Sequence, residues 1–133
     1  MLNENVIRVL QNNLWDLATC RDGQPNVVPV AFKDITSEGK LLVGDVFLKN
    51  TLDNLRYNDR IAISVYDGQK LEGYQIKGRA KHLTEGEIVS KFKAQVEKVF
   101  HGAATDIFPK PAFGLAIFFL YYFKIRSNSA KLG

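Results

Sequence analysis

The sequence predicts a small, mainly β domain in which antiparallel strands are flanked by short helices. Three observations lead to this expectation. Apolar and polar residues alternate through 60–67 and 73–83, which is the pattern of half-buried strands. Asp22-Gly23 lies between two apolar-rich runs and supplies the positive φ that a tight hairpin turn requires. Other segments repeat apolar residues at spacings of three and four, as amphipathic helices do.

Length and composition indicate one domain. The chain has 133 residues, of which 46% are hydrophobic, and this is enough for a single core, so we expect one domain over residues 1–133. The net charge is +4, from 18 Lys+Arg against 14 Asp+Glu, and the two signs are mixed along the chain. Charge alone therefore names no ligand, and a solvated surface explains it more simply than an anion site.

The cysteine content and the termini predict a cytoplasmic protein without membrane insertion. Cys20, the one cysteine, has no partner for an intrachain disulfide, and the N-terminal residues lack the basic start and apolar run of a signal peptide. The longest apolar stretch, 112–123, is shorter than the roughly 18 to 20 residues that span a bilayer.

The pattern in the first half of the chain predicts one helix followed by a β-meander. A helix is expected at 5–14 and strands at 14–20, 26–35 and 40–46, separated by turn residues. Pro29 lies inside the second of these strands and has no N–H for a ladder. It must therefore lie on a sheet edge or at an interruption of the pairing.

The second half adds two helices and three strands. A helix at 49–58 with Asn50 or Thr51 as its N-cap is expected before the two alternating strands. Thr84 and Glu87 form a capping box that opens a helix through about residue 100. The last strand, 112–125, is apolar on both faces, so we expect a second subunit to cover one of them and form a homodimer.

Most catalytic constellations are missing from the sequence. His82 and His101, the two histidines, fall in different predicted elements, so no metal site is expected. Cys20 lies on a predicted core strand and is more simply a buried structural thiol than a nucleophile. Neither a Gly-x-Ser-x-Gly elbow nor a P-loop is present.

One segment has the chemistry of an anion site. Lys49-Asn50-Thr51 stands where a strand ends and a helix begins, and a helix start offers unpaired N–H groups and a partial positive charge. Lys49 adds a full charge and Thr51 a hydroxyl donor, which together suit a phosphate. A plain N-cap explains the same residues, and that alternative stays open.

Five segments in their order and spacing resemble the pyridoxamine 5′-phosphate oxidase-like flavin-binding proteins, and particularly the small single-domain FMN-binding members. The similarity covers roughly residues 14–100, and the segments are NVVPVAF at 26–32, GD at 44–45, KNTLDNL at 49–55, NDRIA at 58–62 and GYQIKGRA at 73–80. The resemblance implies a six-stranded antiparallel split β-barrel of Greek-key type, with peripheral helices, that forms a homodimer holding FMN at the subunit boundary.

The resemblance also implies a set of FMN-binding residues. The isoalloxazine ring is expected against the backbone of the second strand, with Gln75 approaching the ring, and the phosphate at the end of the third strand and the following helix start. The implied contacts are Val28, Pro29, Val30, Ala31, Gly44, Asp45, Lys49, Asn50, Thr51 and Gln75. Relatives usually read Asn-Lys-Thr where this chain reads Lys49-Asn50-Thr51. The lysine expected to contact the phosphate is therefore displaced by one position, to Lys49. Lys77 or Arg79 is an alternative for the cation that contacts the phosphate.

Two functional hypotheses stay open. The first is a flavin-dependent oxidoreductase or electron carrier whose redox partner is a small molecule or a nicotinamide nucleotide. The second is a non-enzymatic protein that stores, buffers or senses FMN, since no catalytic side chain is evident. Binding to nucleic acid is disfavoured because aromatic and basic residues do not interleave on an exposed strand. Pyridoxal-pocket side chains are not recognisable apart from Lys33, so vitamin B6 synthesis is not expected. A deazaflavin phosphate or haem propionates remain alternative anions.

Overall fold

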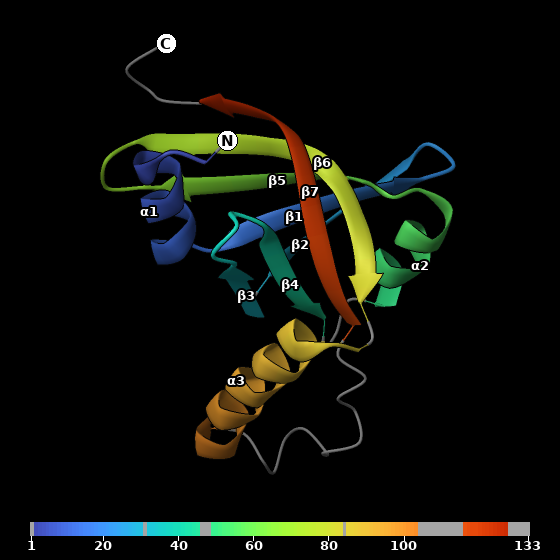
Figure 1. Cartoon of the computed structure of the whole chain (residues 1–133). Coiled ribbons are helices and arrows are strands. Elements are labelled where there is room, and N and C mark those ends of the chain that lie inside the picture. Colours follow the sequence, from blue (N-terminus) through green and yellow to red (C-terminus); the bar gives the residue numbers. More distant parts are fainter. Residues whose placement is uncertain (1, 31, 46–48, 84, 104–115, 128–133) are drawn as a thin grey trace.

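The structure, a computed structural model, describes residues 2–30, 32–45, 49–83, 85–103 and 116–127 (Figure 1). Within these residues every strand belongs to one antiparallel, seven-stranded sheet of order β2-β1-β5-β6-β7-β4-β3. The strands are β1 (Trp15–Arg21), β2 (Gln24–Val30), β3 (Phe32–Ile35), β4 (Leu41–Asp45), β5 (Arg60–Asp67), β6 (Glu72–Leu83) and β7 (Ala116–Ser127).

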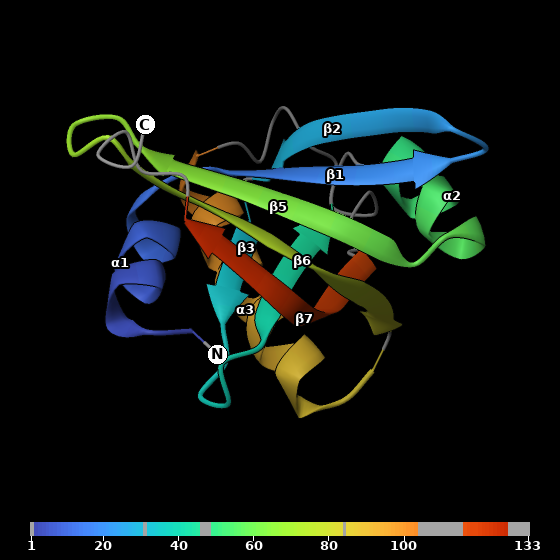
Figure 2. The ribbon, with the colours of Figure 1, turned by 90° about the horizontal axis from the view of Figure 1, so that it is seen from above.

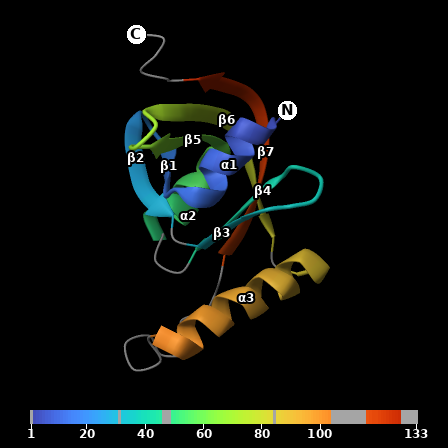
Figure 3. The same ribbon diagram turned by 90° about the vertical axis from the view of Figure 1, so that its left-hand side faces the viewer.

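The described residues form three helices around this sheet. They are α1 (Glu4–Asn12), α2 (Lys49–Tyr57) and α3 (Glu87–Ala103). Figure 1 shows α1 and α2 at opposite ends of the curved sheet, and both Figure 1 and Figure 3 show α3 beneath it. The mainly β class with peripheral helices, predicted from the alternating strands, is confirmed.

The expected second strand, 26–35, is two strands in the structure. Its first part pairs with β1 at one edge of the sheet, and its second part pairs with β4 at the opposite edge. Residue 31 lies outside the described residues. The change of partner from β1 to β4 gives the sheet seven strands instead of the six expected. Seen from above, the sheet curls so that these two edges approach each other (Figure 2).

The period-two pattern places the core as predicted. Ile61, Ile63 and Val65 of β5 are buried, while the intervening residues are exposed or half-buried. In β6 the expected inward residues are buried or half-buried, and the expected outward residues are exposed. The largest fully buried side chain, Trp15, donates its indole Nε1–H to the carbonyl of Leu10 at 2.7 Å, which joins the sheet to α1.

Two predicted helix caps are wrong. The second helix begins at Lys49, so Asn50 and Thr51 lie within its first turn and neither is the N-cap. The third helix begins at Glu87, where the carbonyl of Gly86 accepts the first intrahelical bond from Ser90 N at 3.0 Å. Glu87 is therefore the first helical residue and cannot be the third, as a capping box with Thr84 requires. Thr84 itself lies outside the described residues.

The last strand, which was expected from 112, is described from Ala116 to Ser127 and runs between β6 and β4. Residues 112–115 lie outside the described residues, as do the side chains of β7. The argument that this strand needs a second subunit over one face therefore stays a prediction.

A charged cluster ties α1 to the β5–β6 hairpin. Arg8 Nη2 lies 2.8 Å from Glu72 Oε1 and 3.1 Å from Oε2, and the Tyr74 hydroxyl donates to Glu72 Oε2 at 2.5 Å. The hydrogen bonds from Arg8 and then Tyr74 hold the pKa of Glu72 below its usual range. Burial, followed by the contact with Glu72, raises the pKa of Tyr74.

This cluster predicts an acid-dependent contribution to stability. Folding lowers the pKa of the Glu72 carboxyl from its ordinary value of 4.5. Such a carboxyl stabilises the native state at pH values above 4.5, and this contribution is lost as the pH falls through the folded-state pKa. We expect Glu72→Gln to lower the melting temperature at pH 7, and the difference from wild type to shrink below pH 4.5. Thermal unfolding followed by circular dichroism between pH 7 and pH 3, with the exposed Glu85→Gln as the control, measures this. A difference that is constant across the range would contradict it.

Candidate functional site

The backbone expected to contact a flavin ring lies on a sheet edge. Val28, Pro29 and Val30 belong to β2, which pairs with β1 on one side and with no other strand of the described part of the chain. Pro29 is exposed and stands opposite Asp16, so the expected edge position of this proline is confirmed. Ala31 lies outside the described residues. The free side of β2 leaves main-chain groups available to a ligand.

Gln75 shares a face with Pro29. Register places Pro29 beside Asp16, Asp16 beside Ser64, and Ser64 beside Gln75, in one row across four strands. All four residues are exposed. Neighbouring strands lie about 4.8 Å apart, so the row spans about 14 Å of the outer face of the sheet. A planar ligand lying on this face can reach both ends of the predicted ring site.

The predicted phosphate residues come from β4 and α2. Gly44 is buried near the end of β4, and Asp45 is the last residue of that strand. Lys49 opens α2, and Asn50 in the same turn is exposed. The first turn of α2 contains no acidic residue, so its unpaired amides and partial positive charge are not offset from within the turn.

Thr51 belongs to a polar cluster that we define as Thr19, Asn26, Thr51 and Asn54. Thr51 has an exposed fraction of 0% and accepts a hydrogen bond from Asn26 Nδ2 at 3.2 Å. Asn26 Nδ2 also lies 3.5 Å from Thr19 Oγ1, which accepts from Asn54 Nδ2 at 3.1 Å. Buried polar groups are costly unless they are hydrogen-bonded, so this cluster fixes how α2 packs on β1 and β2.

The polar cluster contains residues that the sequence analysis did not assign to the site. Thr19 follows Trp15 and Leu17 at every second position, and Asn26 precedes Val28 and Val30 in the same way. The alternation therefore already placed two polar side chains on an otherwise apolar inward face. An inward polar residue needs a partner, and this was the signal that could have identified them.

Arg79, one of the two alternative phosphate cations, lies near the C-terminal end of α2. Arg79 stands opposite Arg60 in the β5–β6 ladder, and Arg60 follows closely after the last residue of α2, Tyr57. A nine-residue helix is about 12 Å long from its first to its last Cα. Lys77 and Arg79 are exposed on the outer face of β6.

Lys33 serves a packing role in this structure. Its ammonium donates to the main-chain carbonyl of Asn13, the C-cap residue of α1, and lies 5.2 Å from the centre of the Trp15 ring. Burial lowers the pKa of Lys33. A cation at a helix C-terminus is favourable because it opposes the partial negative charge there.

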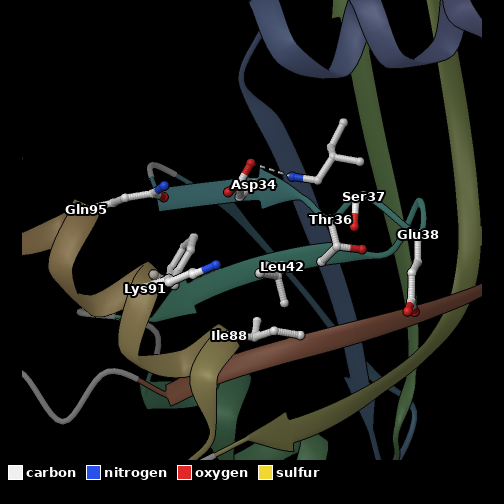
Figure 4. Close-up of a pocket in the computed structure, with 10 residues that line it drawn as sticks. Asp34, Thr36, Ser37, Glu38, Leu42, Ile88, Lys91 and Gln95 are labelled. Atoms are coloured by element: carbon white, nitrogen blue, oxygen red, sulfur yellow. Dashed lines mark hydrogen bonds between the residues drawn. The ribbon is translucent and has the colours of Figure 1, made fainter.

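A separate cavity lies between α3 and the β3–β4 hairpin (Figure 4). It has a volume of about 270 Å³, and none of the predicted FMN contacts lines it. The charged residues that line it are Asp34, Glu38 and Lys91. Lys91 Nζ already lies 3.6 Å from Glu87 Oε1, with which it forms an ion pair. Two carboxylates against one paired ammonium make this cavity unfavourable for a phosphate, so the cavity does not replace the α2 start as the anion site.

The described residues contain no group of three or more His, Cys, Asp or Glu side chains that could hold a metal ion. Cys20 is a free thiol and is half-buried, so the expectation of a buried side chain was only partly right. Among the helices of the described ranges, none is both long and apolar enough to cross a membrane.

Comparison with protein families gives one match that covers most of the chain. Residues 4–118 match the family model described as pyridoxamine 5′-phosphate oxidase. A protein of Methanocaldococcus jannaschii that is named only as uncharacterized is 32% identical over 134 aligned positions, which cover 98% of this chain and 87% of that protein.

Solved structures share the fold at lower identity. HupZ of Group A Streptococcus has a TM-score of 0.76 and 22% identity, covering 98% of this chain and 96% of the other. A protein of Mesorhizobium loti described as FAD-binding has a TM-score of 0.68 and 21% identity, covering 97% of this chain and 96% of the other. These likenesses show the same split-barrel architecture.

The geometry around Lys33 predicts a loss of stability when its charge is removed. Lys33→Met keeps the apolar stem over Trp15 but removes the hydrogen bond to Asn13 and the charge at the end of α1. We expect about 1 kcal/mol less free energy of unfolding in urea. The exposed Lys98→Met, on α3, is the matched control and is expected to match wild type. Equal stability of the two variants would remove this packing role from Lys33.

Proposed function

The chain belongs to the pyridoxamine 5′-phosphate oxidase family, and on that premise we propose that it is an FMN-binding flavoprotein acting as an oxidoreductase or electron carrier. The observation that carries the proposal is the contact of the first turn of α2 with β2, through Asn26 and Thr51. It brings the expected phosphate site beside the expected ring site. The FAD-binding structure from Mesorhizobium loti supports a flavin ligand on this fold.

Different parts of the site would hold different parts of FMN. The amides at the start of α2, with Lys49, Asn50 and Thr51, suit the phosphate, because a helix start and a cation both favour a dianion. Gly44 and Asp45 lead the chain from β4 toward that turn. The free backbone edge of β2 and the amide of Gln75 supply donors and acceptors for the polar rim of the ring.

The chemistry of such a site comes from the bound flavin, which accepts and donates electrons. The residues of this chain orient the ring and limit the access of water to it. In the outer-face row of Pro29, Asp16, Ser64 and Gln75, Asp16 is the titratable side chain. A small molecule or a nicotinamide nucleotide is the redox partner that fits this exposed face.

A second subunit fits the same outer face. Val27 is 65% exposed and pairs with Ala18, which pairs with Ala62, so an apolar row of small side chains runs beside the polar row. Apolar residues exposed together favour association. The homodimer proposed here would cover this row and enclose a flavin lying on it.

A non-enzymatic role in storing or sensing FMN is the second candidate. It is favoured by the composition of the outer-face row, in which Asp16 is the one side chain able to act as an acid or base. Anaerobic stopped-flow mixing of the FMN-loaded protein with NADH or NADPH separates the two functions. Rapid bleaching of the flavin absorbance supports the oxidoreductase, and unchanged absorbance with both nucleotides supports storage.

The proposed phosphate contacts predict a specific loss of FMN affinity. Lys49→Ala should weaken FMN binding by about 1 to 3 kcal/mol, because it removes a charge-assisted contact. Thr51 is fully buried, so Thr51→Ala should weaken binding only through the loss of its hydrogen bond with Asn26, which holds the start of α2. Flavin fluorescence titration measures the change, and thermal unfolding verifies that the variants are folded. The exposed Lys81→Ala, on the outer face of β6, should bind FMN as wild type does.

Two outcomes would contradict the proposal. A wild-type protein that is colourless as purified and leaves FMN fluorescence unchanged on titration does not bind the cofactor. If Arg79→Ala weakens FMN binding while Lys49→Ala does not, the phosphate lies away from the start of α2.

A further inference from the structure

Two arginines face each other on the outer side of the sheet without a charge partner. Register places Arg60 of β5 directly opposite Arg79 of β6, and both side chains are exposed. Neither side chain forms an ion pair, a hydrogen bond or a ring contact with another described residue. Like charges directly opposite each other on neighbouring strands destabilise a sheet. The pair therefore has a cost in stability that no contact within the described part of the chain offsets.

The other arginines whose side chains the structure describes all have an acidic partner. Arg8, Arg21 and Arg56 each have a side-chain nitrogen between 2.8 and 3.7 Å from a carboxylate oxygen. Acidic residues thus accompany arginine elsewhere on this surface but not at the pair formed by Arg60 and Arg79.

The outward residues of β5 and β6 carry positive charge and no negative charge. They are Arg60, Ala62, Ser64, Tyr66, Gln75, Lys77, Arg79 and Lys81. On the next strand, Lys124 of β7 stands opposite Lys77 in the ladder. A group of cations without an opposing carboxylate creates a local positive potential that attracts an anion.

The cations lie at defined distances from the proposed ring site. Ser64 and Gln75 belong to the outer-face row described above. Lys77 lies two residues from that row along β6, and Arg60 and Arg79 lie four residues from it, which correspond to about 7 and 14 Å at 3.4 Å per residue. A nicotinamide dinucleotide carries its pyrophosphate one ribose away from the redox ring, and its phosphorylated form, NADP, carries a further phosphate on the second ribose. The order of the cations along the strands matches this order of phosphates.

We propose that Arg60 and Arg79 bind the 2′-phosphate of NADPH and that Lys77 contacts its pyrophosphate. This inference rests on the proposed function, because it names the redox partner of the same outer face. The planar guanidinium group binds phosphate oxygens through paired hydrogen bonds, and a dianion between two arginines replaces their repulsion by attraction. The apolar row that a second subunit is proposed to cover ends at Ala62 on β5, so β6 lies at its edge.

A single-stranded nucleic acid is the other anion that a basic sheet face attracts. Proteins that bind single strands stack the bases on aromatic side chains placed among the cations. Tyr66, the aromatic residue among the outward residues of these two strands, lies six residues from Arg60 along β5. This separation of aromatic and basic side chains favours the dinucleotide.

The test measures equilibrium binding of NADP+ and NAD+ to the FMN-loaded protein by isothermal titration calorimetry. The oxidised nucleotides do not reduce FMN, so they report binding alone. The variants are Arg60→Gln and Lys77→Gln, and the control is Lys98→Gln, which makes the same change in net charge at an exposed position on α3. An oligothymidylate is titrated as a third ligand, and thermal unfolding is recorded for every variant.

We expect the wild type to bind NADP+ at least about 10-fold more tightly than NAD+, as for a gain of charge-assisted hydrogen bonds. Arg60→Gln should weaken NADP+ binding by about 10- to 100-fold and NAD+ binding by less than about threefold. Lys77→Gln should weaken the binding of both nucleotides alike, and Lys98→Gln the binding of neither. The melting temperature of Arg60→Gln should equal or exceed that of the wild type, because the substitution relieves repulsion.

Four results would overturn the inference. Equal wild-type affinities for NADP+ and NAD+ would show that no group recognises the additional phosphate. Tighter binding of the oligothymidylate than of NADP+, lost in Arg60→Gln, would assign the face to nucleic acid. Weaker FMN binding by Arg60→Gln would assign the pair to the FMN phosphate, and a lowered melting temperature of this variant would show a structural role. In each case FMN binding by the wild type, measured separately, still supports the proposed function. Its absence overturns both.

Discussion

The fold depends on one covalent constraint: β2 and β3 are joined through a single residue but lie at opposite edges of the sheet. A flat sheet of seven strands cannot satisfy this, because its edges would be about 29 Å apart. The sheet must therefore curl until the edges approach, and β2 does lie in contact with β4. The curled sheet encloses the core and leaves the outer side of β2 without a strand partner. The same constraint places β4 beside β2, and α2 packs on β1 and β2.

The polar cluster completes the site that this curvature produces. An apolar contact between α2 and the β1–β2 hairpin would give a similar packing energy but would not fix the rotation of the helix. Hydrogen bonds from Asn26 and Asn54 to two buried hydroxyls are directional, and each is weakened if the helix turns about its axis. The start of α2 is thereby held beside the free edge of β2. Stability and the proposed binding geometry therefore depend on the same side chains.

Much of this fold could be predicted from the sequence, because period-two alternation is a direct consequence of strand geometry. The strand at 60–67 was predicted with its observed bounds, and the inward residues of β6 were identified correctly. The division of the 26–35 strand was not predicted, since a strand that changes partners keeps its alternation, and Pro29 indicated only that pairing was incomplete. The N-cap at Asn50 or Thr51 was wrong because the first turn of a helix and its cap favour similar residues. The contact of Asn26 with Thr51 joins residues 25 positions apart in the chain, and no local pattern contains such a contact.

The most direct test of the central claim is to map FMN onto the backbone of the protein. Two-dimensional ¹H–¹⁵N NMR spectra recorded during FMN titration report each amide separately. If FMN binds as proposed, the largest shifts occur at the first turn of α2 and along β2, with Gln75 also affected. Riboflavin should reproduce the shifts along β2 but not those at α2. Shifts confined to Ile35, Ile88 and Lys91 around the α3 cavity, with α2 and β2 unchanged, would contradict it.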